Sequence, residues 1–234
     1  MSSWQDSVPG YNAVPEKLAR LSSREARLRR PVKRNGWLWA ALFLALLAGC
    51  GDKTPRLPKL AASDVIVAFG DSLTYGTGAA EQESYPAVLS QLIGREVVRS
   101  GVPGEVTAQG LQRLTEVIDE YRPRLVIVCL GGNDMLRKVS LAEIKSNLRS
   151  IIRAIKDRGI EVVLIGVPQP ALLSSAPEFY AELAKEFVIP YEGRILASVL
   201  YAADMKSDPI HPNAKGYRRL AEAVAALLRK AGAI

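Results

Sequence analysis

Apolar positions follow two different periods along residues 64–234, and each period predicts one kind of element. Short, nearly continuous apolar runs occur at 65–69 and 125–130, as expected for strands that are buried on both faces of a sheet. Elsewhere apolar residues recur every three or four positions, which is the spacing of one helix face. The clearest example is 107–121, and Pro123 ends it. The chain therefore alternates between buried strands and amphipathic helices.

The same patterns, together with capping residues, place the remaining elements. Ser140 and Glu143 form a capping-box sequence that begins a helix. The expected strands are 65–69, 96–99, 125–130, 161–167 and 188–191, and the expected helices are 85–93, 107–121, 140–158, 178–187 and 213–230. Strands separated by helices form parallel βαβ units with right-handed crossovers. We therefore expect an α/β fold, a three-layer α/β/α sandwich of about five parallel strands with a flavodoxin-like plan.

Composition and charge narrow the classes of partner. The chain has 234 residues, of which 48% are hydrophobic, so it is long enough for one α/β domain and an additional segment. The formal net charge of +7 is concentrated in residues 1–49, which contain eight Lys/Arg and three Asp/Glu. The remainder contains 23 basic and 21 acidic residues. Because the main domain is nearly neutral, the charge does not indicate a nucleic-acid partner.

The segment before Cys50 has the pattern of a targeting signal. Residues 29–34 are basic, residues 37–48 are apolar, and small residues precede Cys50. This arrangement resembles a bacterial lipobox, in which Cys50 becomes the lipidated first residue of the mature protein. The apolar run is shorter than the ~20 residues that a membrane-spanning helix needs. We therefore expect a lipid-anchored protein of the bacterial cell envelope, facing the periplasm or the exterior.

Three segments follow from this interpretation. Residues 1–49 are the N-terminal extension with its signal peptide, residues 50–63 are a tether, and residues 64–234 are the main domain. Because residues 1–31 make an unusually long start for a signal peptide, we hypothesise that translation begins at Val32. The alternative is a basic surface helix over residues 16–30.

The candidate chemistry begins with His211, the only histidine in the chain. A single histidine excludes a multi-histidine metal site. It lies three residues after Asp208 in a turn bounded by prolines, and Ser72 follows the first expected strand. A serine hydroxyl needs a base to become a nucleophile, and an aspartate can orient and stabilise the imidazole. Ser72, Asp208 and His211 are therefore the candidate catalytic residues.

An oxyanion would need hydrogen-bond donors close to the same serine. The backbone N–H groups of Ser72 and Gly101 and the side-chain amide of Asn133 are the candidates. Each of these residues follows a different expected strand. Because the carboxyl ends of parallel strands form the ligand-binding edge of such a sheet, we expect the three donors to converge there.

Four short segments carry a resemblance to a known family. They are residues 69–74 (Phe-Gly-Asp-Ser-Leu-Thr), 100–104 (Ser-Gly-Val-Pro-Gly), 131–134 (Gly-Gly-Asn-Asp) and 208–212 (Asp-Pro-Ile-His-Pro). Each alone is a weak motif. Together, and in this order, they resemble the sequence blocks of the GDSL or SGNH hydrolases. Within that family the chain most resembles the bacterial arylesterase, acyl-CoA thioesterase and lysophospholipase group.

The resemblance implies a role for each candidate residue. It implies that Ser72 is the nucleophile, that Asp208 and His211 complete the triad, and that Gly101 and Asn133 complete the oxyanion hole with Ser72. It also implies an ester-hydrolysing enzyme without a cofactor, acting on a small-molecule or lipid ester. Membrane contact would come through lipidated Cys50. The sequence gives no indication of an oligomeric state.

Local residues argue against other sites. Thr74 stands where a Gly-x-Ser-x-Gly elbow requires glycine, and Glu81 stands where a dinucleotide fingerprint requires its third glycine. Asp71 and Asp134 lack a nearby histidine and further carboxylates for a metal site, so we expect them to accept backbone hydrogen bonds. Cys129 lies in an apolar run, where we expect a buried, inert thiol.

The substrate is less constrained by the sequence than the reaction. The expected function is hydrolysis of carboxylic esters or thioesters. The apolar segment 168–173 could line an acyl pocket, or it could form a packed surface loop. The alternative within catalysis is a carbohydrate or peptidoglycan O-acetyl esterase. A hypothesis of a different class is a non-catalytic, envelope-binding lipoprotein.

Overall fold

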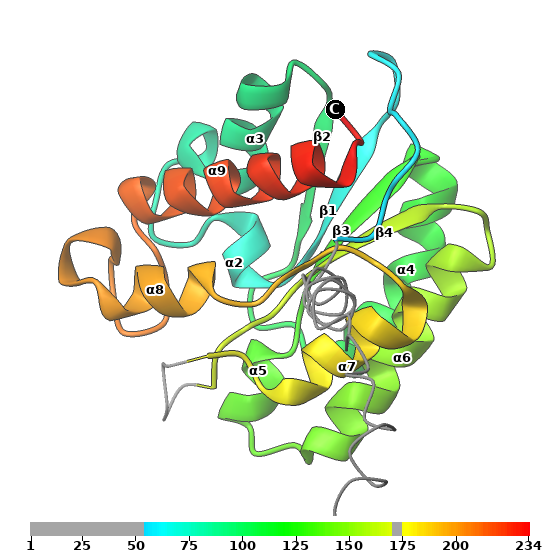
Figure 1. Ribbon diagram of the computed structural model, residues 1–234. Helices are drawn as coiled ribbons and strands as arrows, with labels where there is room; N and C mark the ends of the chain where they lie inside the picture. Colours follow the sequence, from blue (N-terminus) through cyan, green and yellow to red (C-terminus); the bar gives the residue numbers. More distant parts are fainter. Residues whose placement is uncertain (1–53, 170–174) are drawn as a thin grey trace, which may run out of the picture. The chain divides into compact units, whose positions relative to one another are not determined.

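The computed structural model describes residues 54–169 and 175–234 (Figure 1). The expected N-terminal extension, its signal peptide and Cys50 lie outside the described residues. None of the described helices is long and apolar enough to cross a membrane.

A parallel sheet forms the centre of the domain. Its strand order is β2-β1-β3-β4-β5, and every pairing is parallel. The strands are β1 (Ile66–Gly70), β2 (Val97–Gly101), β3 (Leu125–Cys129), β4 (Glu161–Ile165) and β5 (Tyr191–Glu192). Each lies within about three residues of its expected position, as is usual for boundaries taken from a pattern. The α/β fold with about five parallel strands is confirmed.

Helices cover both faces of this sheet (Figure 1). On one face, α3 (Tyr85–Ile93) packs against α9 (Ala214–Ala231). On the other face, α4 (Thr107–Tyr121) packs against α6 (Leu141–Lys156), which in turn contacts α7 (Glu178–Phe187). These are the five amphipathic helices that the sequence predicts. Their apolar faces account for the outer layers of the three-layer sandwich.

Short helices fill segments that the sequence pattern leaves as loops. They are α2 (Ser72–Tyr75), α5 (Gly132–Leu136) and α8 (Ile195–Tyr201), with 3₁₀ turns at Glu81–Glu83 and Ala203–Met205. Helices of this length contain two turns or fewer, so the sequence has no room for a repeating apolar face. Two of them, α2 and α5, follow directly after strands β1 and β3.

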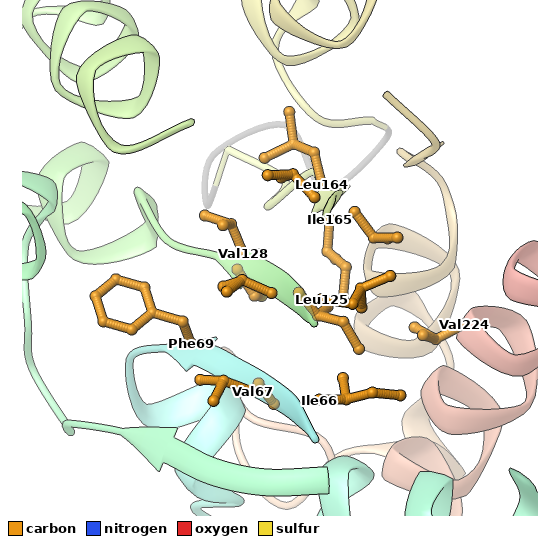
Figure 2. Close-up of a cluster of buried hydrophobic side chains, with 14 of the residues drawn as sticks. Ile66, Val67, Phe69, Leu125, Val128, Leu164, Ile165 and Val224 are labelled. Atoms are coloured by element: carbon orange, nitrogen blue, oxygen red, sulfur yellow. The ribbon is translucent and has the colours of Figure 1, made fainter. Parts of the chain in front are cut away.

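The buried core is continuous across the sheet (Figure 2). Side chains from β1, β3, β4 and α9 gather in one cluster. Every residue of β1 and β3 is buried, which explains why these strands are nearly continuous apolar runs. In the edge strand β2, only Val97 is buried, which explains its weaker pattern.

The domain begins before the expected boundary at residue 64. Leu57 and Leu60 are buried, and their backbone N–H groups donate to the carbonyls of Ala231 (2.9 Å) and Ala233 (2.8 Å). The two leucines therefore pack on the C-terminal end of the chain instead of belonging to a free tether. Two apolar residues three positions apart were the available signal for this packing.

Candidate active site

Three strands end at the same level. Gly70, the last residue of β1, is in register with Gly101 of β2 and with Cys129 of β3. The segments that leave these strands therefore start at one edge of the sheet. Ser72 begins α2 two residues after β1, and Asn133 lies in the first turn of α5. The parallel register thus brings together candidate residues that are about 60 positions apart in the sequence.

The segment around Ser72 has a defined backbone. Asp71 precedes α2, and its Oδ1 accepts a hydrogen bond from the N–H of Leu73 at 3.0 Å. Gly76 ends the helix with φ of 93°. Gly101 lies against α2, where a Cβ atom would be 2.2 Å from the backbone nitrogen of Tyr75. Glycine at position 101 therefore allows α2 to pack directly on the end of β2.

Asp208 and His211 form a compact turn. Oδ1 of Asp208 accepts hydrogen bonds from the N–H groups of Ile210 and His211, both at 2.8 Å. Oδ2 of Asp208 lies 2.8 Å from Nδ1 of His211. Burial opposes ionisation of Asp208, but the hydrogen bonds from the His211 ring and from these two N–H groups outweigh it and lower its pKa below the ordinary value. Asp208 is therefore a carboxylate at neutral pH.

This carboxylate sets the tautomer of His211. A carboxylate only accepts hydrogen bonds, so Nδ1 carries the proton and Nε2 is left as an acceptor. Nε2 lies 3.0 Å from Oγ of Ser72, within reach for the hydroxyl to donate to it. The arrangement can transfer the Ser72 proton to an imidazole that a carboxylate orients. The structure thus brings Ser72, His211 and Asp208 into one hydrogen-bonded chain.

Asn133 lines the same pocket as Ser72 and His211. Its Nδ2 donates to the carbonyl oxygen of Glu105 at 3.0 Å and to Oδ2 of Asp71 at 3.3 Å. Gly131 precedes α5 with φ of 113°, a conformation that favours glycine. The amide therefore has partners for both of its hydrogens, and the bond to Asp71 is the longer one.

Three carboxyl groups are buried beneath these residues, those of Asp71, Glu105 and Asp134. Burial raises the pKa of Asp71 to about 7; the hydrogen bond from Leu73 acts against this rise, and the charges of Glu105 and Asp134 add to it. Asp134 accepts from the backbone N–H (2.9 Å) and the hydroxyl (2.6 Å) of Thr107. The expectation that Asp71 and Asp134 accept backbone hydrogen bonds is confirmed.

Glu105 and Arg113 were not predicted from the sequence. Nε of Arg113 donates to Oε1 of Glu105 at 2.6 Å, and Glu105 is buried. Arg113 belongs to α4, and a charged residue of an amphipathic helix normally faces solvent. Nothing in a single sequence distinguishes this arginine from its exposed neighbours. Glu105 directly follows the motif segment 100–104 and is not part of any motif.

An apolar pocket opens beside Ser72. Ser72, Asn133 and His211 line it, whereas Gly101 and Asp208 are not among its described lining residues. The apolar part of its wall consists of Leu73, Leu136, Val167, Pro168, Leu200 and Ile210. Of the expected acyl-binding segment, Pro168 lines the pocket, while residues 170–174 lie outside the described part of the chain. Of the other apolar wall residues, Leu73 and Ile210 belong to motif segments, whereas Leu136, Val167 and Leu200 come from segments that carry no motif.

Two further expectations concern metals and thiols. Within residues 54–169 and 175–234, no group of three or more His, Cys, Asp or Glu side chains is arranged to hold a metal ion. Cys129 is fully buried in β3, as expected, and burial raises the pKa of its thiol well above the ordinary value.

The chain is similar to several known hydrolases. The chain is 31% identical over 185 residues to the Escherichia coli protein "Thioesterase 1/protease 1/lysophospholipase L1", covering 76% of this chain and 85% of that protein. It is 31% identical to an arylesterase of Vibrio mimicus, covering 72% and 90%. The crystal structure of AlinE4, an SGNH-hydrolase family esterase, superposes with a TM-score of 0.57 at 34% identity and covers 74% of this chain and 98% of its own.

The match to a family description covers most of the domain. Residues 68–219 match the GDSL-like lipase/acylhydrolase family. This range includes all four of the short segments that carry the sequence resemblance. The chain therefore belongs to the GDSL-like lipase/acylhydrolase family.

Proposed function

We propose that this protein hydrolyses carboxylic esters or thioesters with Ser72 as its nucleophile. The observation that carries the proposal is the hydrogen-bonded chain from Asp208 through His211 to Ser72, with contacts of 2.8 and 3.0 Å. It ends at the mouth of an apolar pocket. The GDSL-like family and its relatives named as esterases, thioesterases and arylesterases support an ester-hydrolysing serine enzyme.

The proposed reaction has two steps. Oγ of Ser72 attacks the ester or thioester carbonyl carbon, and Nε2 of His211 takes the hydroxyl proton. The tetrahedral intermediate then collapses, and the imidazolium gives this proton to the departing alcohol or thiol. In the second step His211 takes a proton from water, and the hydroxide attacks the carbonyl carbon of the acyl-enzyme. The second tetrahedral intermediate then collapses, the imidazolium returns the proton to Oγ of Ser72, and the acid leaves. Asp208 stabilises the imidazolium in both steps without itself becoming protonated.

The oxyanion of each tetrahedral intermediate needs donors. As the first residue of α2, Ser72 has a backbone N–H without an intrahelical acceptor. Asn133 supplies its Nδ2, and we propose that the 3.3 Å bond to Asp71 is exchanged for a bond to the oxyanion. The shorter bond to Glu105 then holds the amide in place. The N–H of Gly101 is the third proposed donor, on the basis of the sequence resemblance.

The pocket wall favours an acyl chain as the substrate group. Six apolar side chains and no basic side chain other than His211 are found among its described lining residues. An acyl chain gains roughly 0.8 kcal/mol for each CH₂ that it buries, so longer esters should bind better until the pocket is filled. An acetyl group would leave most of this wall unused. A medium- or long-chain ester is therefore the favoured substrate class.

A chain-length series tests this proposal. The purified protein is assayed with p-nitrophenyl esters from acetate to palmitate, and Ser72→Ala is the blank. We expect kcat/KM to rise from acetate to a maximum at medium or long chains, and Ser72→Ala to remain folded and lose ~10⁴-fold or more of its turnover. Activity confined to acetate would favour a carbohydrate or peptidoglycan O-acetyl esterase. An inactive wild-type chain would favour the non-catalytic lipoprotein.

We also propose that Cys50 is lipidated and anchors the protein in the bacterial cell envelope. The support is the sequence pattern before Cys50. Leu57 is already held by its hydrogen bond to Ala231, so the connecting chain reaches at most about 25 Å from Cys50. The domain would then work close to the lipid surface. Metabolic labelling with an alkyne fatty acid should mark the wild type and not Cys50→Ser, and equal labelling of both would exclude this anchor.

A further inference from the structure

We propose that Arg113 is a positioning residue for the oxyanion site, acting through the segments that carry Ser72, Gly101 and Asn133. The inference rests on the proposed function of these residues. It concerns a side chain that belongs to α4, outside the four motif segments. The proposed role is to hold the ends of β1 and β2 and the loop after β2 in one fixed arrangement.

The contacts of the Arg113 guanidinium support this role. Its Nη2 donates to the carbonyl of Gly70 and to the carbonyl of Ser100, each at 3.1 Å, and its Nη1 donates to the Ser100 hydroxyl at 2.8 Å. Gly70 is two residues before Ser72, and Ser100 directly precedes Gly101. The carbon of the guanidinium also lies 4.1 Å from the centre of the Phe69 ring. One side chain therefore joins the carboxyl ends of the two strands.

The connection to Asn133 passes through Glu105. Nε and Nη2 of Arg113 donate to the two carboxylate oxygens of Glu105, at 2.6 and 2.8 Å. Such a bidentate pair fixes both distance and orientation. The backbone carbonyl of the same Glu105 accepts the 3.0 Å hydrogen bond from Nδ2 of Asn133. By fixing Glu105, Arg113 fixes the acceptor that orients the proposed oxyanion donor.

The charge of Arg113 is needed at this place. The Glu105 side chain is only 4% exposed, and Asp71 and Asp134 are buried near it. An uncompensated carboxylate under the site would oppose the negative charge that develops on the oxyanion. The guanidinium offsets the charge of Glu105 within this group. Arg113 thus contributes both geometry and a favourable field.

A double-mutant cycle with Asn133 tests the inference on the full chain. Arg113→Met keeps an aliphatic side chain at this position but removes the guanidinium. We expect kcat to fall by about 10- to 100-fold, as for other small misplacements of a catalytic group. We expect KM for a p-nitrophenyl ester to change by less than about threefold, because the acyl pocket does not contain Arg113. In the Asn133→Ala background, the same substitution should lower kcat by a smaller factor, because only the part that acts through the segments of Ser72 and Gly101 remains.

Two further variants separate positioning from stability. Arg149→Met is the matched control, because it removes another bidentate Arg–Glu pair, to Glu186 between α6 and α7, away from the pocket. It should leave kcat unchanged. Arg113→Lys keeps the positive charge but cannot reach all the acceptors, so it should fold and still lose kcat. If Arg113→Met does not fold, the cycle is run with Arg113→Lys, and Glu105→Gln provides a second check.

The outcomes distinguish this inference from the proposed function. A folded Arg113 variant with kcat within about twofold of the wild type would overturn the positioning role, and so would an equal loss in both backgrounds. If Asn133→Ala itself leaves kcat unchanged, the oxyanion assignment of the proposed function fails instead. A loss that appears with Arg113→Met and Arg113→Lys, and that is smaller in the Asn133→Ala background, supports the inference.

Discussion

Two polar regions meet at Ser72, and they differ in both construction and burial. The first, Asp208 and His211, lies within four consecutive residues, and the Asp208 side chain is 44% exposed. The second joins four residues from four segments, Asp71, Glu105, Arg113 and Asn133. We call it the buried network because its two carboxyl groups are buried, while Arg113 and Asn133 are half-buried. The first region depends on a local turn, whereas the second depends on the whole sheet.

This difference leads to different expected consequences of mutation. A substitution in the exposed pair should change the chemistry and leave the fold almost intact, because a surface ion pair contributes little to stability. A substitution in the buried network should affect both the chemistry and the stability of the fold, because it leaves buried polar groups without partners. Substitutions in the two regions should therefore separate a loss of turnover from a loss of stability.

Asp208→Asn should give the largest loss of turnover with little loss of stability. The asparagine oxygen can still accept from the N–H groups of Ile210 and His211, which preserves the turn. Its neutral amide cannot stabilise the imidazolium, so turnover should fall by roughly 10³- to 10⁴-fold. Steady-state kinetics and urea unfolding of the same preparation measure both quantities. A large loss of unfolding free energy would show that the exposed pair is also structural.

Asn133→Ala should reduce turnover less but stability more. Removing the amide deletes one proposed oxyanion donor, which costs on the order of 10²–10³ in kcat. It also leaves the carbonyl of Glu105 and the carboxyl of Asp71 without this donor, so the unfolding free energy should fall by about 1–3 kcal/mol. Unchanged kcat with lowered stability would assign Asn133 to structure alone.

Asp71→Asn should change how stability depends on pH. The pKa of Asp71 is about 7 in the folded protein and ordinarily 3.8, so between these values the folded state holds a proton that the unfolded state releases. Wild-type stability therefore falls as pH rises from about 4 to above 7, by at most about 4 kcal/mol from this group. The asparagine side chain of the variant cannot ionise, so the variant does not lose this stability as pH rises.

The difference between variant and wild type is the quantity to measure, by urea unfolding from pH 5 to pH 9. The unfolding free energy of Asp71→Asn relative to the wild type should increase as pH rises. Glu186→Gln is the control: its hydrogen bond from Arg149 lowers the pKa of the exposed Glu186, so this group is ionised in both states throughout that range. A parallel pH dependence of Asp71→Asn and wild type would show that Asp71 is already charged at pH 5.

The contrast between the two regions also explains how much could be predicted from the sequence. Ser72, Asp208 and His211 lie in short motifs. Continuous apolar runs predicted β1 and β3, and apolar residues at every third or fourth position predicted helices. Gly101 illustrates a partial success: it was expected in a loop but ends β2 and lies under α2. Position 101 requires glycine because α2 packs so closely on it, and no local sequence pattern predicts this packing.

Arg113 and the pocket wall could not be predicted for the same physical reason. Arg113 is one of several charged residues on α4, and only the tertiary fold directs it toward Ser100 and Glu105. The apolar wall gathers single residues from separate elements, such as Leu136 of α5 and Leu200 of α8. Contacts of this kind depend on the register of the sheet, not on neighbours in the sequence. The same limit applied to Leu57 and Leu60, whose packing partner is the far end of the chain.

The most direct test of the account is to locate the nucleophile by covalent labelling. The full chain is treated with a fluorophosphonate, digested, and analysed by mass spectrometry to find the modified residue. We predict one adduct per chain, on the peptide that contains Ser72, no adduct in Ser72→Ala, and much slower labelling in His211→Ala. An adduct on another residue, or undiminished labelling of Ser72→Ala, would contradict the central claim.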